Sequence, residues 1–143
     1  MRGIKTILSW ILALLLIAMF VYLADRKLFA DPAQPNIIFA TLAAKSGFEL
    51  FEPTGRFVTG IIELLAALFL FLPFTRRFGA FIAFCVSAGA VALHLSPWLG
   101  TEVPLVLGAP ETDGGMLFYL ALGLLTASAI LMLIHPGKRR RRL

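Results

Sequence analysis

The stretch that decides the fold runs Phe57-Val-Thr-Gly-Ile-Ile-Glu-Leu-Leu-Ala-Ala-Leu-Phe-Leu-Phe-Leu-Pro-Phe74, and Glu63 lies near its middle. Apart from this one acid, the stretch is apolar enough to cross a bilayer. A carboxylate in hydrocarbon is costly unless it is paired, neutralised or turned toward a cavity. Glu63 therefore either fixes helix packing or carries chemistry, and its surroundings distinguish these two roles.

Three further apolar runs resemble this one, and the four expected spans cover residues 6–24, 56–74, 78–98 and 115–135. Each is close to the ~20 residues that a helix needs to cross the hydrocarbon core. Because lipid offers no hydrogen bonds to the backbone, such runs must be helices. The chain is 59% hydrophobic and 15% charged, whereas soluble domains carry about 25% charged residues. We expect one all-α transmembrane domain over 1–143, an antiparallel four-transmembrane-helix bundle.

The uneven distribution of basic residues predicts the orientation of the bundle. The net charge is +5, and five of the 13 basic residues lie in the tail 136–143. Four more lie before the first span or between the second and third, namely Arg2, Lys5, Arg76 and Arg77. The connection 99–114 has acidic residues and neither Lys nor Arg. By the positive-inside rule, both termini are expected in the cytoplasm, with the protein in the cytoplasmic membrane of a bacterium or archaeon.

The tail also predicts a first partner, the lipid bilayer. Clustered arginines beside a span are attracted to anionic lipid headgroups. The expected lipid-anchoring residues are Arg139, Arg140, Arg141 and Arg142. One short basic tail without interleaved aromatic residues does not indicate a nucleic-acid partner.

The first span has a rival interpretation as a signal peptide, with Arg2 and Lys5 as its basic region. Its apolar run from 7 to 23 has 17 residues, which exceeds the ~7–15 residues usual in signal peptides. We therefore expect an uncleaved first helix.

Composition disfavours two kinds of chemistry. Cys85 is the only cysteine, and dithiol–disulfide exchange needs a second thiol. The two histidines stand 41 residues apart and no cysteine pair is present. Because metal sites need several such ligands at short spacing, the sequence predicts no metal site.

The connection between the first two spans is long and partly apolar. Residues 35–46 are expected to form a short extracytoplasmic helix in the membrane interface. Pro35 is the expected first helical residue and Gly47 the expected end. Thr54 is expected to cap the second span.

Small residues predict which helix faces are pressed against other helices. The residues one turn from Glu63 are Thr59, Gly60, Ala66 and Ala67. His94 ends a similar face on the third span, with Gly79, Ala83, Ser87 and Ala90. Tyr119 shares a face with Gly115, Gly123 and Thr126 on the fourth. We expect Glu63, His94 and Tyr119 to meet in the outer half of the membrane, within about one helical turn (5.4 Å) of the same depth.

A carboxylate, an imidazole and a phenol can form a hydrogen-bonded set that binds a ligand or handles protons. The residues expected at the mouth of this site are Lys45, Glu49, Glu52, Arg56 and Asp113. Asp113 is also the expected N-cap of the last span. Three interpretations stay open: a structural contact in which Glu63 and His94 satisfy each other, a ligand or redox site, and a path for protons or ions.

Five short segments, in this order and spacing, resemble the DoxX family of small four-helix membrane proteins over about residues 16–134. They are Asp25-Arg-Lys-Leu28, Gly60-Ile-Ile-Glu-Leu-Leu65, Thr75-Arg-Arg-Phe-Gly-Ala80, Ala90-Val-Ala-Leu-His-Leu95 and Asp113-Gly-Gly115. The family is named for a subunit of an archaeal terminal quinol oxidase linked to thiosulfate:quinone oxidoreductase activity. The resemblance implies a quinone as ligand, with Glu63 and His94 as the proton-handling residues beside its ring.

The function expected from these observations is an auxiliary or ligand-holding subunit of a quinone-linked membrane redox assembly. Its partners would be other redox subunits, and a homo-oligomer is compatible with the sequence. As an enzyme the chain would be at most a subunit of a quinone-linked oxidoreductase. One alternative is a non-enzymatic membrane assembly or stress-response factor with a structural Glu63–His94 pair. A small proton or solute transporter is a second alternative.

Overall fold

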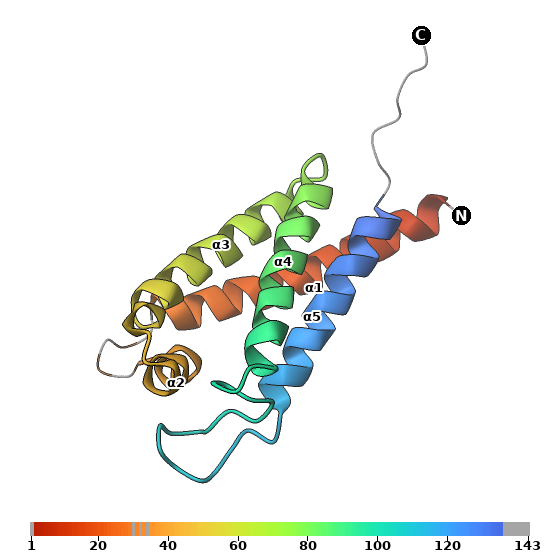
Figure 1. Ribbon diagram of the computed structural model, residues 1–143. Helices are drawn as coiled ribbons and strands as arrows, with labels where there is room; N and C mark the ends of the chain where they lie inside the picture. The colour runs from red at the N-terminus through yellow and green to blue at the C-terminus, as the bar shows by residue number, and fades with distance from the viewer. Residues whose placement is uncertain (1, 30, 32, 34, 136–143) are drawn as a thin grey trace.

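The described part of the chain, residues 2–29, 31, 33 and 35–135 of a computed structural model, is helical and contains no β-strand (Figure 1). The elements are α1 (Arg2–Leu28), α2 (Ile37–Ser46), the 3-10 turn η1 (Glu49–Phe51), α3 (Thr54–Phe71), α4 (Arg76–His94) and α5 (Met116–Ile134). Four of them, α1, α3, α4 and α5, are long and apolar enough to cross a membrane. The all-α class and the four apolar helices are thus confirmed. The expected anchoring residues of the tail, Arg139 to Arg142, lie outside the described residues.

Helix ends differ from the expected ones at four places. α1 continues to Leu28, so Lys27 is helical, and α4 ends at His94 instead of 98. α2 begins at Ile37 instead of Pro35, and Asn36 caps it, because its side chain accepts a hydrogen bond from the N–H of Ile38. Thr54 is the first residue of α3 and makes no cap.

Gly47 ends α2 as expected. Its φ of 73° is left-handed, a conformation that glycine adopts without the steric cost a Cβ would bring. Its N–H donates to the carbonyl of Ala43. The chain can therefore reverse directly after α2 and lead through η1 into α3.

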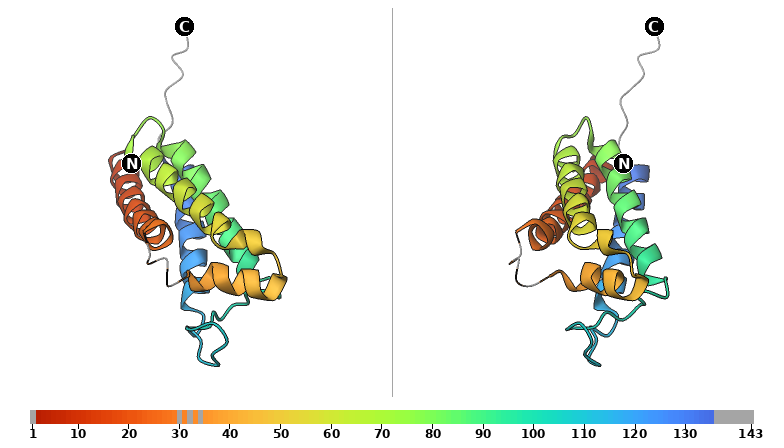
Figure 2. Two further views of the ribbon diagram at one scale, coloured as in Figure 1. Left: turned by 90° about the vertical axis from the view of Figure 1, so that its left-hand side faces the viewer. Right: turned by 60° about the vertical axis from the view of Figure 1, so that its left-hand side comes forward.

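Helix α1 packs along α3, α3 packs on α4, and α4 packs on α5. Helices α3 and α4 are joined by the turn 72–75. They are in contact near this turn and separate toward their other ends (Figure 1). Figure 2 shows α2 lying across that wide end. The wedge between α3 and α4 is thus covered by α2 at its base.

The close approach at the narrow end of the wedge depends on Gly79. A Cβ at this position would lie 2.5 Å from the backbone nitrogen of Leu70. Beside it, Arg76 is buried, and its Nε donates to the carbonyl of Leu70 at 2.9 Å. The Arg76 guanidinium also lies 3.7 Å from the centre of the Trp10 ring, a favourable cation–π distance. These contacts hold α1, α3 and α4 together at one end.

His135 ties a further helix to the same end. Its Nε2 donates to the carbonyl of Pro73 at 3.0 Å, and its Nδ1 accepts from the Ser9 hydroxyl at 2.8 Å. Burial lowers the pKa of His135, and the nearby Arg76 and Arg77 lower it further. A lowered pKa favours the neutral ring, in which one nitrogen donates and the other accepts, and this form can make both hydrogen bonds.

The wide end has its own small core. α2 packs against the segment that follows α4 through the buried side chains of Phe39, Leu42, Leu99 and Val103. This second cluster is separate from the main core among α1, α3, α4 and α5. It keeps α2 in place over the wedge.

The tight crossing at Gly79 leads to a first prediction. Gly79→Ala should destabilise the protein by about 1–3 kcal/mol, as overpacking does, because the added methyl meets backbone atoms of α3. Gly123→Ala on α5 is the matched control, since a Cβ there meets nothing within 4 Å. Thermal unfolding in detergent would measure both. Equal stabilities of the two variants would contradict the crossing described here.

Candidate functional site

Glu63 is buried and paired with Lys27. The Lys27 Nζ lies 2.9 Å from Oε1 and 3.1 Å from Oε2 of Glu63, and the two side chains are 9% and 3% exposed. The same ammonium lies 3.4 Å from the carbonyl of Leu23. Both carboxylate oxygens and the available N–H groups of the ammonium therefore have partners. The pair joins the end of α1 to the middle of α3.

A glycine one turn before Glu63 allows this contact. A Cβ at Gly60 would lie 2.8 Å from Cγ of Leu28 and 3.2 Å from Cβ of Lys27. With hydrogen in that place, α1 approaches α3 closely enough for the lysine to reach the carboxylate. The expectation that small residues mark a face pressed against another helix is met at Gly60.

Arg56 reinforces the same junction. Its Nη1 donates to the carbonyl of Lys27, and its Nε lies 2.7 Å from Oε1 of Glu52. Because the last carbonyls of a helix lack partners within it, this bond satisfies an otherwise open group of α1. Arg56 is 7% exposed and does not line the cavity described below, so it belongs to the helix junction. Lys45 and Glu49, from the same predicted set, are exposed.

A cavity of about 820 Å³ opens beside the ion pair. Its walls come from all five α-helices and the segment after α4, and most of the lining side chains are apolar. The polar or charged residues that line it are Lys27, Thr59, Glu63, Ser87, His94 and Ser96. This volume falls within the 300–1,000 Å³ usual for small-molecule sites.

His94 closes one end of this cavity. It is 3% exposed, its Nδ1 lies 3.0 Å from the carbonyl of Gly100, and its ring centre lies 5.7 Å from that of Phe118. Because a carbonyl only accepts, Nδ1 carries the hydrogen, which leaves Nε2 as an acceptor in the neutral ring.

Glu63 and His94 line one cavity at two different levels. Measured along each helix from the turn 72–75 at 1.5 Å per residue, Glu63 lies about 12 Å away and His94 about 27 Å. The expectation that they lie within one turn of the same depth is wrong, because α4 ends at His94. Ser87 lies about 17 Å from the turn, about one helical turn beyond the level of Glu63. It is the polar lining residue of α4 nearest to that level.

The Ser87 hydroxyl is the one polar group of the lining that stands out. Ser87 is 2% exposed, and its Oγ has no hydrogen-bond partner among the described residues. By contrast, the Thr59 hydroxyl donates to the carbonyl of Gly55 at 2.8 Å, and the Ser96 hydroxyl to that of Leu93 at 2.6 Å. A buried polar group without a partner is destabilising, so a group that occupies the cavity could satisfy this one.

Tyr119 does not belong to the site, and its assignment is corrected. It is 69% exposed and lines a separate, smaller hollow with Leu15 and Met19. The face of α5 that turns inward carries Ala121, Leu124, Ser128 and Leu131. Gly123 and Thr126, which suggested the inward face, are exposed.

Asp113, the last residue predicted at the mouth, holds the start of α5. Its carboxylate accepts from the N–H groups of Leu117 at 2.8 Å, Val103 at 2.9 Å and Gly115 at 3.0 Å. Burial pushes the pKa of Asp113 upward, but these three donors and the nearby His94 hold it below its ordinary value. The N-cap residue of α5 is Gly115, so the predicted N-cap position is wrong, although the Asp113 carboxylate still accepts from N–H groups at the start of the helix. Asp113 does not line the cavity.

Sequence reasoning missed Lys27 as the partner of Glu63. Lys27 follows Asp25 and Arg26 at the end of the first apolar run, where charges normally face solvent. The sequence could have revealed this contact if the first helix had been extended past residue 24. Lys27 then lies one turn after Leu23, on the helix face of Phe20 and Leu16, which are also buried.

The chain matches no family model, no curated protein and no solved structure. Within residues 2–29, 31, 33 and 35–135, no group of three or more His, Cys, Asp or Glu side chains could hold a metal ion. The interpretation of the site therefore depends on its geometry.

The buried ion pair leads to a second prediction. Lys27→Met should lower the free energy of unfolding by about 3–5 kcal/mol, because it leaves the Glu63 carboxylate buried without its partner. The double variant Lys27→Met/Glu63→Leu should recover most of this loss. Lys45→Met is the control, since Lys45 is exposed. Unfolding in detergent mixtures would measure all three, and a Lys27→Met variant as stable as the control would refute the pair.

The Asp113 clamp leads to a third prediction. Because the folded-state pKa is depressed, its contribution to stability is present above the ordinary pKa of an aspartate, about 3.9, and is lost as the pH falls through the folded-state value. Amide hydrogen exchange of Val103 and Leu117, corrected for the intrinsic rate, should be slow at neutral pH and faster in acid. Asp113→Asn should weaken protection and remove most of this pH dependence. Identical pH profiles for wild type and variant would refute the clamp.

Proposed function

We propose that this chain is an integral membrane protein that holds a lipid-like ligand for a membrane redox assembly. In this proposal α1, α3, α4 and α5 cross the membrane as an antiparallel bundle, with both termini in the cytoplasm. Helix α2 lies at the extracytoplasmic interface. The distribution of basic residues supports this orientation.

The outward faces of the long helices support a hydrocarbon environment. Large apolar side chains on them are exposed, for example Leu14 at 54%, Leu68 at 54% and Phe81 at 49%. Water-soluble proteins rarely expose contiguous apolar surface on this scale. In a bilayer the same side chains would contact acyl chains at no cost.

The observation that carries the ligand-holding role is the cavity itself. It combines a volume of about 820 Å³ and a mostly apolar wall with a few polar groups at defined levels. This combination is typical of sites that take small, largely apolar molecules and orient them through one or two hydrogen bonds.

A quinone fits this description and is the ligand that the resemblance to DoxX proteins implies. Its ring would lie near Glu63 and Ser87, or near His94, with its apolar tail in the remaining space. Both Glu63 oxygens are bonded to Lys27. This supports a role in which Glu63 shapes and orients the ligand site more than one in which it passes protons. The chain would then act as an auxiliary subunit whose redox partner supplies the electron transfer.

A second candidate function is favoured because both carboxylate oxygens of Glu63 are already bonded to Lys27. If Lys27 and Glu63 only join α1 to α3, the protein could serve as a non-enzymatic assembly or stress-response factor. A small proton or solute transporter is the third candidate. It would require a continuous polar path, whereas the lining of this cavity is mostly apolar.

Co-purification gives the fourth prediction and tests the ligand-holding role. Lipid extraction of the purified protein, followed by mass spectrometry, should recover a quinone or similar neutral lipid enriched over its share of the membrane. Glu63→Gln should retain less of it, because the amide weakens the contact with Lys27 and disturbs the cavity wall. Glu49→Gln, at an exposed position, is the matched control.

Recovery of bulk membrane lipids alone from the wild type would contradict the ligand-holding role. A Glu63→Gln variant that loses thermal stability but keeps its full ligand content would instead favour a purely structural pair.

A further inference from the structure

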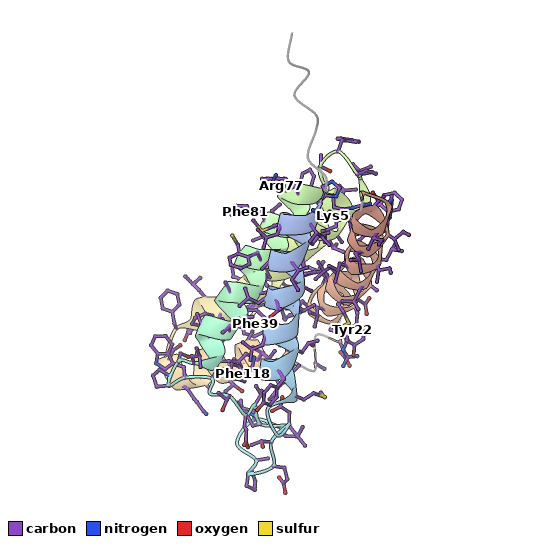
Figure 3. The ribbon with its side chains drawn as sticks, turned by 90° about the vertical axis from the view of Figure 1, so that its right-hand side faces the viewer. Lys5, Tyr22, Phe39, Arg77, Phe81 and Phe118 are labelled. Carbon is purple, nitrogen blue, oxygen red and sulfur yellow. The ribbon has the colours of Figure 1, made fainter. Side chains whose placement is uncertain are left out.

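The cavity is open at its side, between α3 and α4. Three of its lining residues on these helices are exposed at the molecular surface: Ile62 at 37%, Phe81 at 49%, and Cys85. Figure 1 shows the two helices separating on this side, and Figure 3 marks Phe81 at the outer edge of α4 and Phe39 closer to the interior. The opening therefore faces sideways, across the helix axes.

Small residues keep this opening clear. Gly89 lines the cavity and is exposed, and a Cβ added there would meet nothing within 4 Å. Ala92, one turn further along α4, is also exposed and also lines the cavity. A side chain added at position 89 would thus begin in open space at the cavity opening.

The charges of the wall cancel. Lys27 and Glu63 neutralise each other at 2.9 Å, and they are the two residues of the lining with Lys, Arg, Asp or Glu side chains. A charged ligand would lose its hydration and find no unpaired opposite charge in the cavity wall, which is costly in a low-dielectric site. A neutral molecule avoids this cost.

One hydroxyl is left to bind such a molecule. Ser87 Oγ is buried, has no partner within the described ranges of the chain, and belongs to the cavity wall about one helical turn from the level of Glu63. A hydroxyl both donates and accepts, so it can bond to a ligand carbonyl or to a ligand hydroxyl.

We infer that the cavity is filled sideways from the hydrocarbon phase, between α3 and α4, by a neutral amphiphile whose carbonyl or hydroxyl group bonds to Ser87. This inference rests on the proposed function, that the cavity holds a ligand. It adds the route of entry, the charge class of the ligand and the residue that binds its polar group.

The native Cys85 provides the readout, because it is the only cysteine of the chain, is exposed and lines the cavity. The protein would be placed in phosphatidylcholine nanodiscs, and alkylation of Cys85 by N-ethylmaleimide would be followed with and without a probe. The neutral probe is a fully substituted benzoquinone with a ten-carbon chain, which has no free ring position to react with the thiol. Decanoate at pH 8 is the charged probe of equal chain length.

The neutral probe should slow alkylation of Cys85 severalfold, and decanoate should not. Ser87→Ala should raise the concentration needed for half-protection about threefold to tenfold, the range expected for one lost hydrogen bond. Equal protection by both probes would overturn the neutral class. An unchanged half-protection concentration in Ser87→Ala would overturn the assignment of Ser87.

Gly89→Leu tests the route, and Gly123→Leu is its matched control. Both changes replace a helical glycine whose Cβ position is open, but Gly123 does not line the cavity. Each variant is compared with its own alkylation rate without probe, which corrects for shielding of Cys85 by the new side chain. Protection should develop at least tenfold more slowly in Gly89→Leu and at the wild-type rate in Gly123→Leu. Equal rates in the two variants would overturn the lateral route.

The failure of this inference can be distinguished from failure of the proposed function. Co-purified ligand together with unaltered entry in Gly89→Leu would reject the route and keep the ligand-holding role. Absence of protection by either probe, with no ligand co-purified, would reject both.

Discussion

A buried ammonium and a buried carboxylate, those of Lys27 and Glu63, hold α1 against α3 at 2.9 Å, and the shape of the molecule depends on this contact. Either charge alone would be costly in an apolar surrounding, and together they remain stable only while the helices stay close. Gly60 allows the approach, and Arg56 fixes the end of α1 through the carbonyl of Lys27. Packing and electrostatics therefore specify the same arrangement of two helices.

The cavity follows from two different constraints on α3 and α4. At the turn 72–75 the helices are held tightly by Gly79 and by Arg76, which bonds to α3 and stacks on Trp10. At the other end α2 lies over them and packs against the segment after α4. A wedge closed at the tip and covered at the base leaves an interior space with an opening at its side. The proposed ligand-holding role depends on this geometry.

Hydropathy was sufficient to predict the four long helices and the short α2, because each long run is almost wholly apolar and the short one lies between Pro35 and Gly47. Glu63 was predictable as a critical residue because an acid within an apolar run must have a partner. Its partner was not predictable by that argument, since Lys27 lies where the apolar run ends and resembles a loop charge. Tyr119 was misplaced because α5 is apolar around its whole circumference, so its sequence does not specify the inward face. The level of His94 depended on where α4 ends, and helix ends are poorly determined by local sequence.

The contact between Lys27 and Glu63 can be measured directly in a bilayer. Solid-state NMR on protein labelled with ¹⁵N at lysine and ¹³C at glutamate would report the separation of Lys27 Nζ and Glu63 Cδ, with Glu63→Gln assigning the signal. The account predicts a separation of about 4 Å or less, as a hydrogen-bonded ion pair requires. The absence of any dipolar coupling between these two nuclei would contradict it.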